Sequence, residues 1–272
     1  MPTIREEHAA MISNHVCKVK ESDYALILQD VLTLTILESV NCMTAIFDLH
    51  RGNYRHIDPQ FQKLLGHPFP VKAGYESNVS FYDLVHPDDV TKLQEADIQA
   101  YDRFHEIAAD KRHHYCMNCD FRIRTASGDY IRIHRNMSPL TYDREGKLWL
   151  VYLQFGCMRY KTDKHPISAW LLDKKTLRME SLMKGWMSAF KKKIISKRVL
   201  EVLILTREGL TVEQIAKELS LSVTTVYNYR RLAMRELGLQ TIDQVNHYLG
   251  LAGIMKLVAQ FIISLFMYGF AT

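Results

Sequence analysis

The sequence predicts two domains of different class: an α+β domain built on a five-stranded antiparallel sheet with flanking helices, followed by a smaller all-α domain. Two observations predict this. Between residues 44 and 155, five β-rich runs alternate with turn signals and short helical segments. Between Thr211 and Leu239, two capped helices meet at a tight corner. The 272 residues are enough for two domains, and 47% apolar with 24% charged residues is an ordinary globular balance.

Turn residues separate the strands of the predicted sheet. Arg51-Gly52-Asn53 marks a hairpin between the first two strands. Asp58-Pro59 opens a short helix that Gly66 closes, and Pro87 with the acids after it starts a helix that runs to about Tyr101. The five expected strands are residues 44–48, 54–57, 115–125, 130–137 and 148–155.

The regions on either side of this domain are harder to interpret. Residues 1–35 suggest a flanking helix region that either packs on the next domain or pairs with a second copy of the chain. Residues 158–194 are expected to form a connector. Within it, two apolar runs flank Asp173-Lys174-Lys175-Thr176. This pattern fits an extra hairpin or a helix almost equally well.

Four motifs in residues 36–157 form a set. They are the Asp58-Pro59 helix closed by Gly66, F-Y-D-L-V-H-P-D-D-V at 81–90, R-I-R-T-A-S-G-D-Y-I-R-I at 122–133 and D-R-E-G-K at 143–147. In these motifs residues 36–157 resemble a PAS domain. The resemblance implies a five-stranded sheet that senses a small-molecule ligand or mediates dimerisation. It leaves the ligand-binding residues unknown, because the function of this fold varies widely.

The all-α segment has the features of a helix-turn-helix. Thr211 and Gln214 form a capping box, Ser222 can cap the second helix, and Gly238 supplies the stop. Val226, Ala233 and Leu237 are expected to face inward. The outer face of the second helix is polar and basic, and its candidate DNA-binding residues are Thr224, Thr225, Tyr227, Asn228, Arg230, Arg231 and Arg235.

Charge is concentrated around this segment. The whole chain has a net charge of +5, and residues 184–240 contain eleven Lys or Arg against five Glu, a surplus of six positive charges. The remainder of the chain is therefore slightly negative. Because phosphate neutralisation by Lys and Arg is the main sequence-independent source of DNA affinity, this asymmetry favours double-stranded DNA as a partner.

Residues 195–250 resemble the LuxR-type four-helix DNA-binding domain. The resemblance rests on I-S-K-R-V-L-E-V-L from Ile195, the two capped helices and T-I-D-Q from Thr241. It implies that Tyr227, Asn228 and Arg231 lie at base edges, with Thr224 and Thr225 near phosphates. Asn228 can pair with adenine and Arg231 with guanine.

Some positions depart from the family pattern and leave the operator sequence open. They are Val199, Tyr229, Leu232 and Glu236. These departures also motivate a second hypothesis, in which a PAS-based signalling protein recruits a partner and its degenerate helix-turn-helix no longer binds DNA. A salt-dependent DNA affinity distinguishes the two hypotheses.

The remaining patterns argue against other classes. A zinc or redox sensor would use Cys116 and Cys119, but there is no second Cys pair, and strand alternation puts the two on opposite faces. We therefore expect no metal and no cofactor. Glycine-rich phosphate loops and nucleophile elbows are missing from the sequence, so an enzyme is not expected and no catalytic residue is assigned. Five scattered cysteines and the lack of a signal-like segment favour the cytoplasm.

The last 22 residues, 251–272, are largely apolar and long enough to raise the question of a membrane helix. Lys256, Gln260 and Ser264 interrupt the segment every fourth residue and place one polar stripe on a helix. We therefore expect an apolar helix that packs on the protein or on a partner subunit rather than in a membrane. The expected function is a transcription regulator whose PAS domain alters DNA binding through the arrangement of a homodimer.

Overall fold

The computed structural model describes residues 2–24, 43–66, 80–158, 167–176, 178–182, 196–207, 209–237, 241, 242 and 245. The chain divides into two compact units, one formed by Met1–Leu172 with Glu180–Met187 and the other by Asp173–Met179 with Ser188–Thr272. The apolar segment 251–272 and residues 25–35 of the expected flanking region lie outside the described residues.

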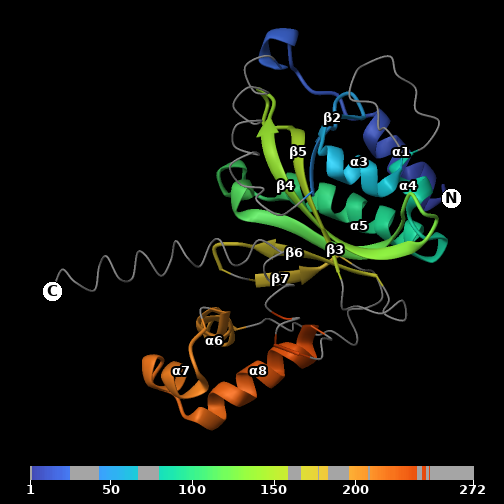
Figure 1. Cartoon of the computed structure of the whole chain (residues 1–272). Coiled ribbons are helices and arrows are strands. Elements are labelled where there is room, and N and C mark those ends of the chain that lie inside the picture. Colours follow the sequence, from blue (N-terminus) through green and yellow to red (C-terminus); the bar gives the residue numbers. More distant parts are fainter. Residues whose placement is uncertain are drawn as a thin grey trace. The chain divides into compact units, whose positions relative to one another are not determined.

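The first unit contains most of a seven-stranded sheet with the strand order β2-β1-β5-β4-β3-β6-β7 (Figure 1). The pairings among the first five strands are antiparallel. The strands are β1 (Met43–Asp48), β2 (Asn53–Ile57), β3 (Tyr115–Arg124), β4 (Tyr130–Tyr142), β5 (Leu148–Cys157), β6 (Ser168–Asp173) and β7 (Arg178–Ser181).

The expected number of five strands is wrong, because β6 and β7 extend the sheet beyond β3. Both lie within residues 158–194, where the sequence suggested a connector with a hairpin or a helix, and the hairpin is the alternative that forms. The ambiguity had a physical source. Residues 169–172 are all buried, and a continuous apolar run has no period that separates a buried strand from a buried helix.

Helices cover one face of this sheet. They are α1 (Ile4–Ser13), α3 (Pro59–Leu65), α4 (Phe81–Leu84) and α5 (Pro87–Glu106), and a 3₁₀ helix, η1 (Ala109–His114), precedes β3. The expected ends of α3 are confirmed. Asp58 caps its start by accepting the Gln60 N–H at 2.7 Å, and Gly66 ends it with a φ of 71°. A Cβ on Gly66 would lie 2.8 Å from the Cβ of Ala126, so glycine is required for space as well as for conformation.

Alternate residues of each strand serve two different cores. Ala45 on β1, Phe121 on β3 and Leu153 on β5 face the helices and form the main hydrophobic cluster with them. Ile46 on β1 and Leu150 on β5 face the other way and pack with Cys17 and Tyr24 from the N-terminal segment. This arrangement follows from the two-residue period of a strand.

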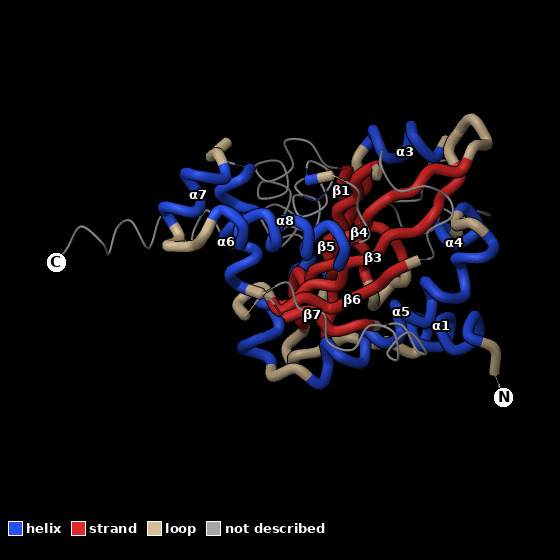
Figure 2. Tube along the Cα trace, turned by 90° about the horizontal axis from the view of Figure 1, so that it is seen from below, coloured by secondary structure: helices blue, strands red, loops and turns tan. Residues whose placement is uncertain are grey.

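The N-terminal segment therefore packs on both sides of the sheet. Helix α1 packs on α5, and the two helices lie side by side in both views (Figure 1, Figure 2). Beyond it, the Lys18 N–H donates to Asp143 at 2.8 Å, and the Tyr24 hydroxyl donates to Asp48 at 2.8 Å. The expected flanking helix thus packs on its own domain.

The second unit contains three described helices, α6 (Lys197–Arg207), α7 (Val212–Glu218) and α8 (Val223–Leu237). The fourth helix expected in this domain falls in residues 241–250, most of which lie outside the described residues.

Candidate DNA-binding face and sensor cavity

Two side-chain caps start the helices of the second unit. The Gln214 N–H donates to Thr211 Oγ1 at 3.3 Å, and the Thr211 N–H donates to Gln214 Oε1 at 2.8 Å. The predicted capping box is therefore confirmed. Ser222 caps α8, because its Oγ accepts the Thr225 N–H at 3.0 Å. Each helix begins at the residue that follows its cap.

The corner between α7 and α8 is a Schellman motif with serine in the place that glycine usually takes. Ser220 has a φ of 53°. Its N–H donates to the Lys217 carbonyl at 3.3 Å, and the Leu221 N–H donates to the Ala216 carbonyl at 2.8 Å. The left-handed conformation costs a residue with a side chain roughly 1–2 kcal/mol. The corner is thus held by backbone bonds despite an unfavourable residue.

One face of α8 packs into the core of the helix-turn-helix. Val226 and Ala233 are fully buried, as predicted. Val226 belongs to a cluster with Val202 from α6 and with Ile215 from α7. The side chain of Leu237, the third predicted inward residue, lies outside the described part. This core fixes which side of α8 points away from the domain.

The opposite side of α8 is exposed and mostly polar. The residues on it are Thr224, Tyr227, Asn228, Arg231 and Arg235. Their spacing of three or four residues places them in one stripe along the helix. Tyr227, at the middle of the stripe, is 51% exposed, which is unusual for a large aromatic side chain. Five of the seven candidate residues therefore share one surface.

The other two candidates, Thr225 and Arg230, lie at the edges of this stripe and are half-buried. Thr225 Oγ1 is 2.8 Å from Ser222 Oγ, so it takes part in the cap. Arg230 donates from Nε to Thr206 Oγ1 on α6 at 3.0 Å. Both side chains are therefore tied to their own domain by contacts that the sequence pattern did not indicate.

The departures from the family pattern at Tyr229 and Leu232 do not fall on the exposed stripe. Both side chains are half-buried, and Tyr229 packs against the core of the helix-turn-helix. A change at Tyr229 therefore alters packing within the domain rather than the outward face. The side chain of Glu236 lies outside the described residues.

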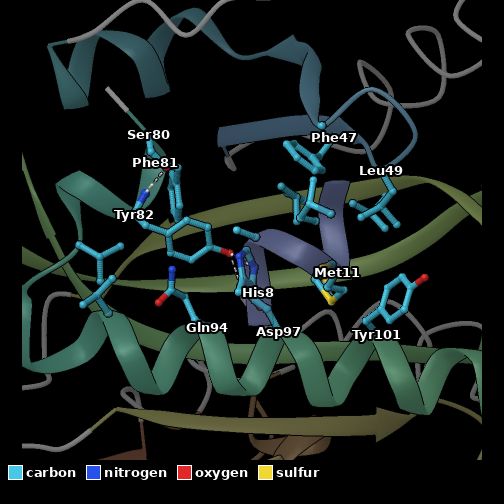
Figure 3. A pocket seen from close by; sticks show the side chains of 18 of the residues that line it. His8, Met11, Phe47, Leu49, Ser80, Phe81, Tyr82, Gln94, Asp97 and Tyr101 are labelled. Atoms are coloured by element: carbon cyan, nitrogen blue, oxygen red, sulfur yellow. Dashed lines mark hydrogen bonds between the residues drawn. The ribbon is translucent and has the colours of Figure 1, made fainter. Parts of the chain in front are cut away.

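The first unit contains a cavity of about 880 Å³, bounded by α1, α4, α5 and the helix-facing side of the sheet (Figure 3). Small-molecule sites typically measure about 300–1,000 Å³. Much of its wall is apolar, and Figure 3 shows Met11, Phe47, Leu49 and Phe81 around it. Such a wall suits a ligand with a largely apolar surface.

A chain of four polar side chains belongs to the cavity wall. Asp97 on α5 forms a buried ion pair with Arg135 on β4 and also accepts the hydroxyl of Tyr82 at 2.5 Å. Nε2 of His8 on α1 lies 3.0 Å from the same hydroxyl. Since the Tyr82 proton is directed at Asp97, His8 is the donor in this contact. These four side chains connect α1, α4, α5 and β4, and Figure 3 shows His8, Tyr82 and Asp97 next to one another.

Burial strongly affects the protonation of these side chains. It lowers the pKa of His8, although the Asp97 charge opposes the shift. Burial also raises the pKa of Tyr82 well above its usual value, and Asp97 adds to this. For Arg135, burial disfavours the cation, but the Asp97 carboxylate together with Cys119 and Tyr82 outweighs burial and raises the pKa. At neutral pH, His8 and Tyr82 are therefore uncharged and Arg135 is a cation.

The sequence pattern left the residues of this cavity unassigned, although it contains a signal. Arg135 occupies a core-facing position of β4 between Ile133 and Met137. Asp97 lies on the buried stripe of α5 with Leu93 and Phe104. A charged residue inside an apolar stripe needs a partner, but the sequence does not say which residue that is. The pairing of Arg135 with Asp97 is apparent only in the folded structure.

The cysteines of β3 are structural in this arrangement. Cys119 lies in the main core with Met117, whereas Cys116 Sγ accepts from Asn118 Nδ2 at 3.4 Å, which fits the expected alternation of faces. Burial raises the pKa of Cys119 to about 12 and so disfavours a reactive thiolate. Among the described residues, no group of three or more His, Cys, Asp or Glu has a metal-binding arrangement. No helix in the described part of the chain is long and apolar enough to cross a membrane.

The first unit has a cavity large enough for a small-molecule ligand, and the second has a helix-turn-helix with an exposed basic stripe. This combination is typical of one class of protein: DNA-binding regulators that respond to a signal. Family comparisons agree. Residues 193–249 match the model described as bacterial regulatory proteins, luxR family, and residues 54–152 match the PAS fold. The chain thus combines a PAS domain with a LuxR-type helix-turn-helix domain, and it is a DNA-binding regulator that senses a signal.

Similar solved structures include the phage VqmA–DPO complex, with 14% identity, 85% of this chain and 92% of that chain covered, and a TM-score of 0.30. A Vibrio cholerae VqmA dimer without target DNA has 16% identity, 83% and 88% coverage and a TM-score of 0.31. Drosophila melanogaster Cycle PAS-B has 13% identity, 42% and 98% coverage and a TM-score of 0.31. Such low scores support no argument about mechanism. A search of curated proteins found no match.

Proposed function

We propose that the chain is a sequence-specific transcription regulator that binds double-stranded DNA through the exposed stripe of α8. The stripe residues Tyr227, Asn228 and Arg231 contact base edges, and Thr224 and Arg235 contact the phosphate backbone. Thr225 and Arg230, which are tied to Ser222 and Thr206, position α8 and lie close enough to its edge to add phosphate contacts. No catalytic step is part of this function.

The observation that supports the proposal best is the separation of the two sides of α8. Val226 and Ala233 are fully buried, while Asn228 and Arg231 are exposed on the opposite side. Amide and guanidinium groups are the side chains that pair bidentately with adenine and guanine in the major groove. A helix held from behind by an aliphatic core presents these groups in a fixed register.

The test starts from DNA, because the operator is unknown. The full chain is used to select binding sites from a pool of random double-stranded DNA, and the affinity for the selected site is compared with that for scrambled DNA. We expect Arg231→Ala to lower the affinity for the selected site by about 1–3 kcal/mol and to relax selectivity at one base pair.

The matched control is Arg198→Ala on α6. Arg198 is exposed and paired with Glu201 at 3.0 Å, so its removal changes the net charge equally without touching the α8 stripe. This variant should retain sequence selectivity. Equal losses of selectivity in both variants would contradict the assignment of Arg231 to a base edge.

The proposal includes a homodimer in the cytoplasm, in which a signal changes the arrangement of two DNA-binding domains. It takes residues 36–157 as the sensor domain, 195–250 as the DNA-binding domain and 251–272 as an apolar helix that supports the dimer. A two-fold dimer predicts selected sites made of two inverted half-sites. Single half-sites together with a monomer mass in solution, with and without DNA, would remove the dimer from the proposal.

The sensor part of the proposal places a small-molecule ligand in the cavity of the first unit. A ligand can shift the equilibrium between two domain arrangements only if it binds one arrangement better than the other. The cavity is suited to this role, since its wall includes His8 on α1 as well as Arg135 on β4 and therefore joins elements that are far apart in the sequence.

A further inference from the structure

Resting on the proposed sensor function, we infer that the cavity selects an uncharged, largely apolar molecule that both accepts and donates a hydrogen bond. The inference follows from the charges that line the cavity and from the polar atoms there that have no protein partner.

The charges of the cavity wall cancel. The Lys, Arg, Asp and Glu side chains that line it are Arg5, Asp83, Asp97 and Arg135. Arg135 pairs with Asp97 in the buried part of the wall. Arg5 approaches Asp83 to 3.9 Å; the Arg5 side chain is largely exposed to solvent and the Asp83 side chain is about half exposed. The wall therefore offers no counter-charge to a charged ligand, which would lose its hydration without compensation.

Both oxygens of the buried Asp97 carboxylate are already engaged by Arg135, and one of them also by Tyr82. One oxygen of Asp97 accepts from Nη2 of Arg135, and the other accepts from Nη1 at 3.3 Å and from the Tyr82 hydroxyl at 2.5 Å. Because the Arg135 guanidinium already neutralises this carboxylate, a cationic ligand would meet a net neutral pair, and displacing the arginine would break a buried ion pair at a large cost.

Two polar atoms of the wall are buried and have no hydrogen-bond partner in the described part of the chain. One is Nε of Arg135, a donor on a side chain that is 95% buried, and the other is Oδ1 of Asn53, an acceptor. Buried polar atoms of native proteins nearly always have a partner. A ligand with one acceptor and one donor would supply both.

The protonation of the remaining titratable side chains agrees with this ligand class. Burial lowers the pKa of His8 and raises the pKa of Tyr54, Tyr82 and Tyr101. All four are therefore uncharged at neutral pH, and none adds to the charge of the wall.

Three probes of one size and shape test the inference: 2-naphthamide, which is neutral, 2-naphthoate, which is an anion, and 2-naphthamidinium, which is a cation. Calorimetric titration of the full chain at pH 7.5 measures each affinity. We expect the amide to bind roughly tenfold or more tightly than either charged analogue.

Two variants sharpen the test by uncovering one charge each. Asp97→Asn leaves Arg135 without its carboxylate, and the preference should move to 2-naphthoate. Arg135→Met leaves Asp97 without its guanidinium, and the preference should move to 2-naphthamidinium. Arg124→Met, an exposed arginine on β3 outside the cavity, is the matched control and should keep the preference of the unaltered chain.

The ranking in the unaltered chain decides the outcome even if the two buried variants fail to fold. Equal or tighter binding of either charged analogue overturns the inference, and so does the absence of binding by all three probes at millimolar concentration. DNA affinity is measured on the same protein without any probe. If the chain binds DNA but the probes do not rank as expected, the inference about the ligand class is wrong and the proposed DNA-binding function is retained. If the chain does not bind DNA, the proposed function itself is wrong.

Discussion

The two units of this chain differ in where their charged residues lie. In the sensor unit, Arg135 and Asp97 lie at core-facing positions and pair inside the domain. In the DNA-binding unit, the described core cluster has an aliphatic centre formed by residues such as Val202 and Ile215, and charges such as Arg231 lie outside. The second unit follows the usual pattern of apolar residues inside and charged residues outside, whereas the first unit departs from it at Arg135 and Asp97. In both units the proposed binding site lies where the charged residues are.

The physical cost differs accordingly. A buried ion pair loses its hydration and is seldom a net source of stability, so a pair that lines a cavity is consistent with a role in binding. An exposed charge on a helix costs almost nothing and is available to a partner. We therefore interpret the buried pair as part of the ligand site and the exposed stripe as the DNA face.

The largest expected effect breaks the buried pair. Arg135→Met leaves Asp97 buried without a counter-charge and should lower the free energy of unfolding of the sensor unit by about 3–5 kcal/mol. The double variant Arg135→Met with Asp97→Leu should recover most of that loss. Urea unfolding of the full chain measures both. A stability of the single variant within experimental error of the unaltered chain would contradict the burial of the Arg135–Asp97 pair.

The converse change places a polar group in the aliphatic core. Val226→Thr puts a hydroxyl in a fully buried position of the second unit. It should lower the free energy of unfolding by about 1–3 kcal/mol, since an aliphatic core offers the hydroxyl no hydrogen-bond partner. Thr224→Val, a change of similar size on the exposed side, is the control. Thermal unfolding compares them, and equal stability of the two variants would argue against the inward direction of Val226.

A smaller effect concerns the corner that directs α8. Ser220→Gly removes the penalty of the left-handed conformation and should stabilise the second unit by roughly 1 kcal/mol. Ser220→Ala retains that penalty and should bring no comparable gain. An equal change in melting temperature for both variants would mean that conformation at this position is not limiting.

The smallest effect is a pH dependence in the sensor unit. Because burial lowers the pKa of His8 in the folded chain, the unfolded chain binds the proton first as the pH falls below about 6.5. Stability is therefore unaffected above that pH and declines below it. His8→Gln should reduce the decline between pH 7 and 5.5, as measured by urea unfolding. An unchanged slope would assign the decline to other histidines.

The sequence predicted the second unit closely and the first unit only in outline. Caps at Thr211 and Ser222 and the inward Val226 are local signals, since each depends on neighbours within one or two helical turns. The two additional strands and the cavity depend on contacts between distant segments. Nothing local marks Arg135 and Asp97 as partners, because they are 38 residues apart in the sequence. Ligand sites formed by several elements are therefore the least visible from sequence.

The measurement that tests the central claim most directly is the salt dependence of DNA affinity for the full chain on its selected site. A regulator that binds through the α8 stripe should lose affinity steeply with rising salt. Arg235→Ala, which removes one proposed phosphate contact, should reduce the slope of log affinity against log salt by about 1. A flat slope, or weak binding that does not distinguish the selected site from scrambled DNA, would contradict the account.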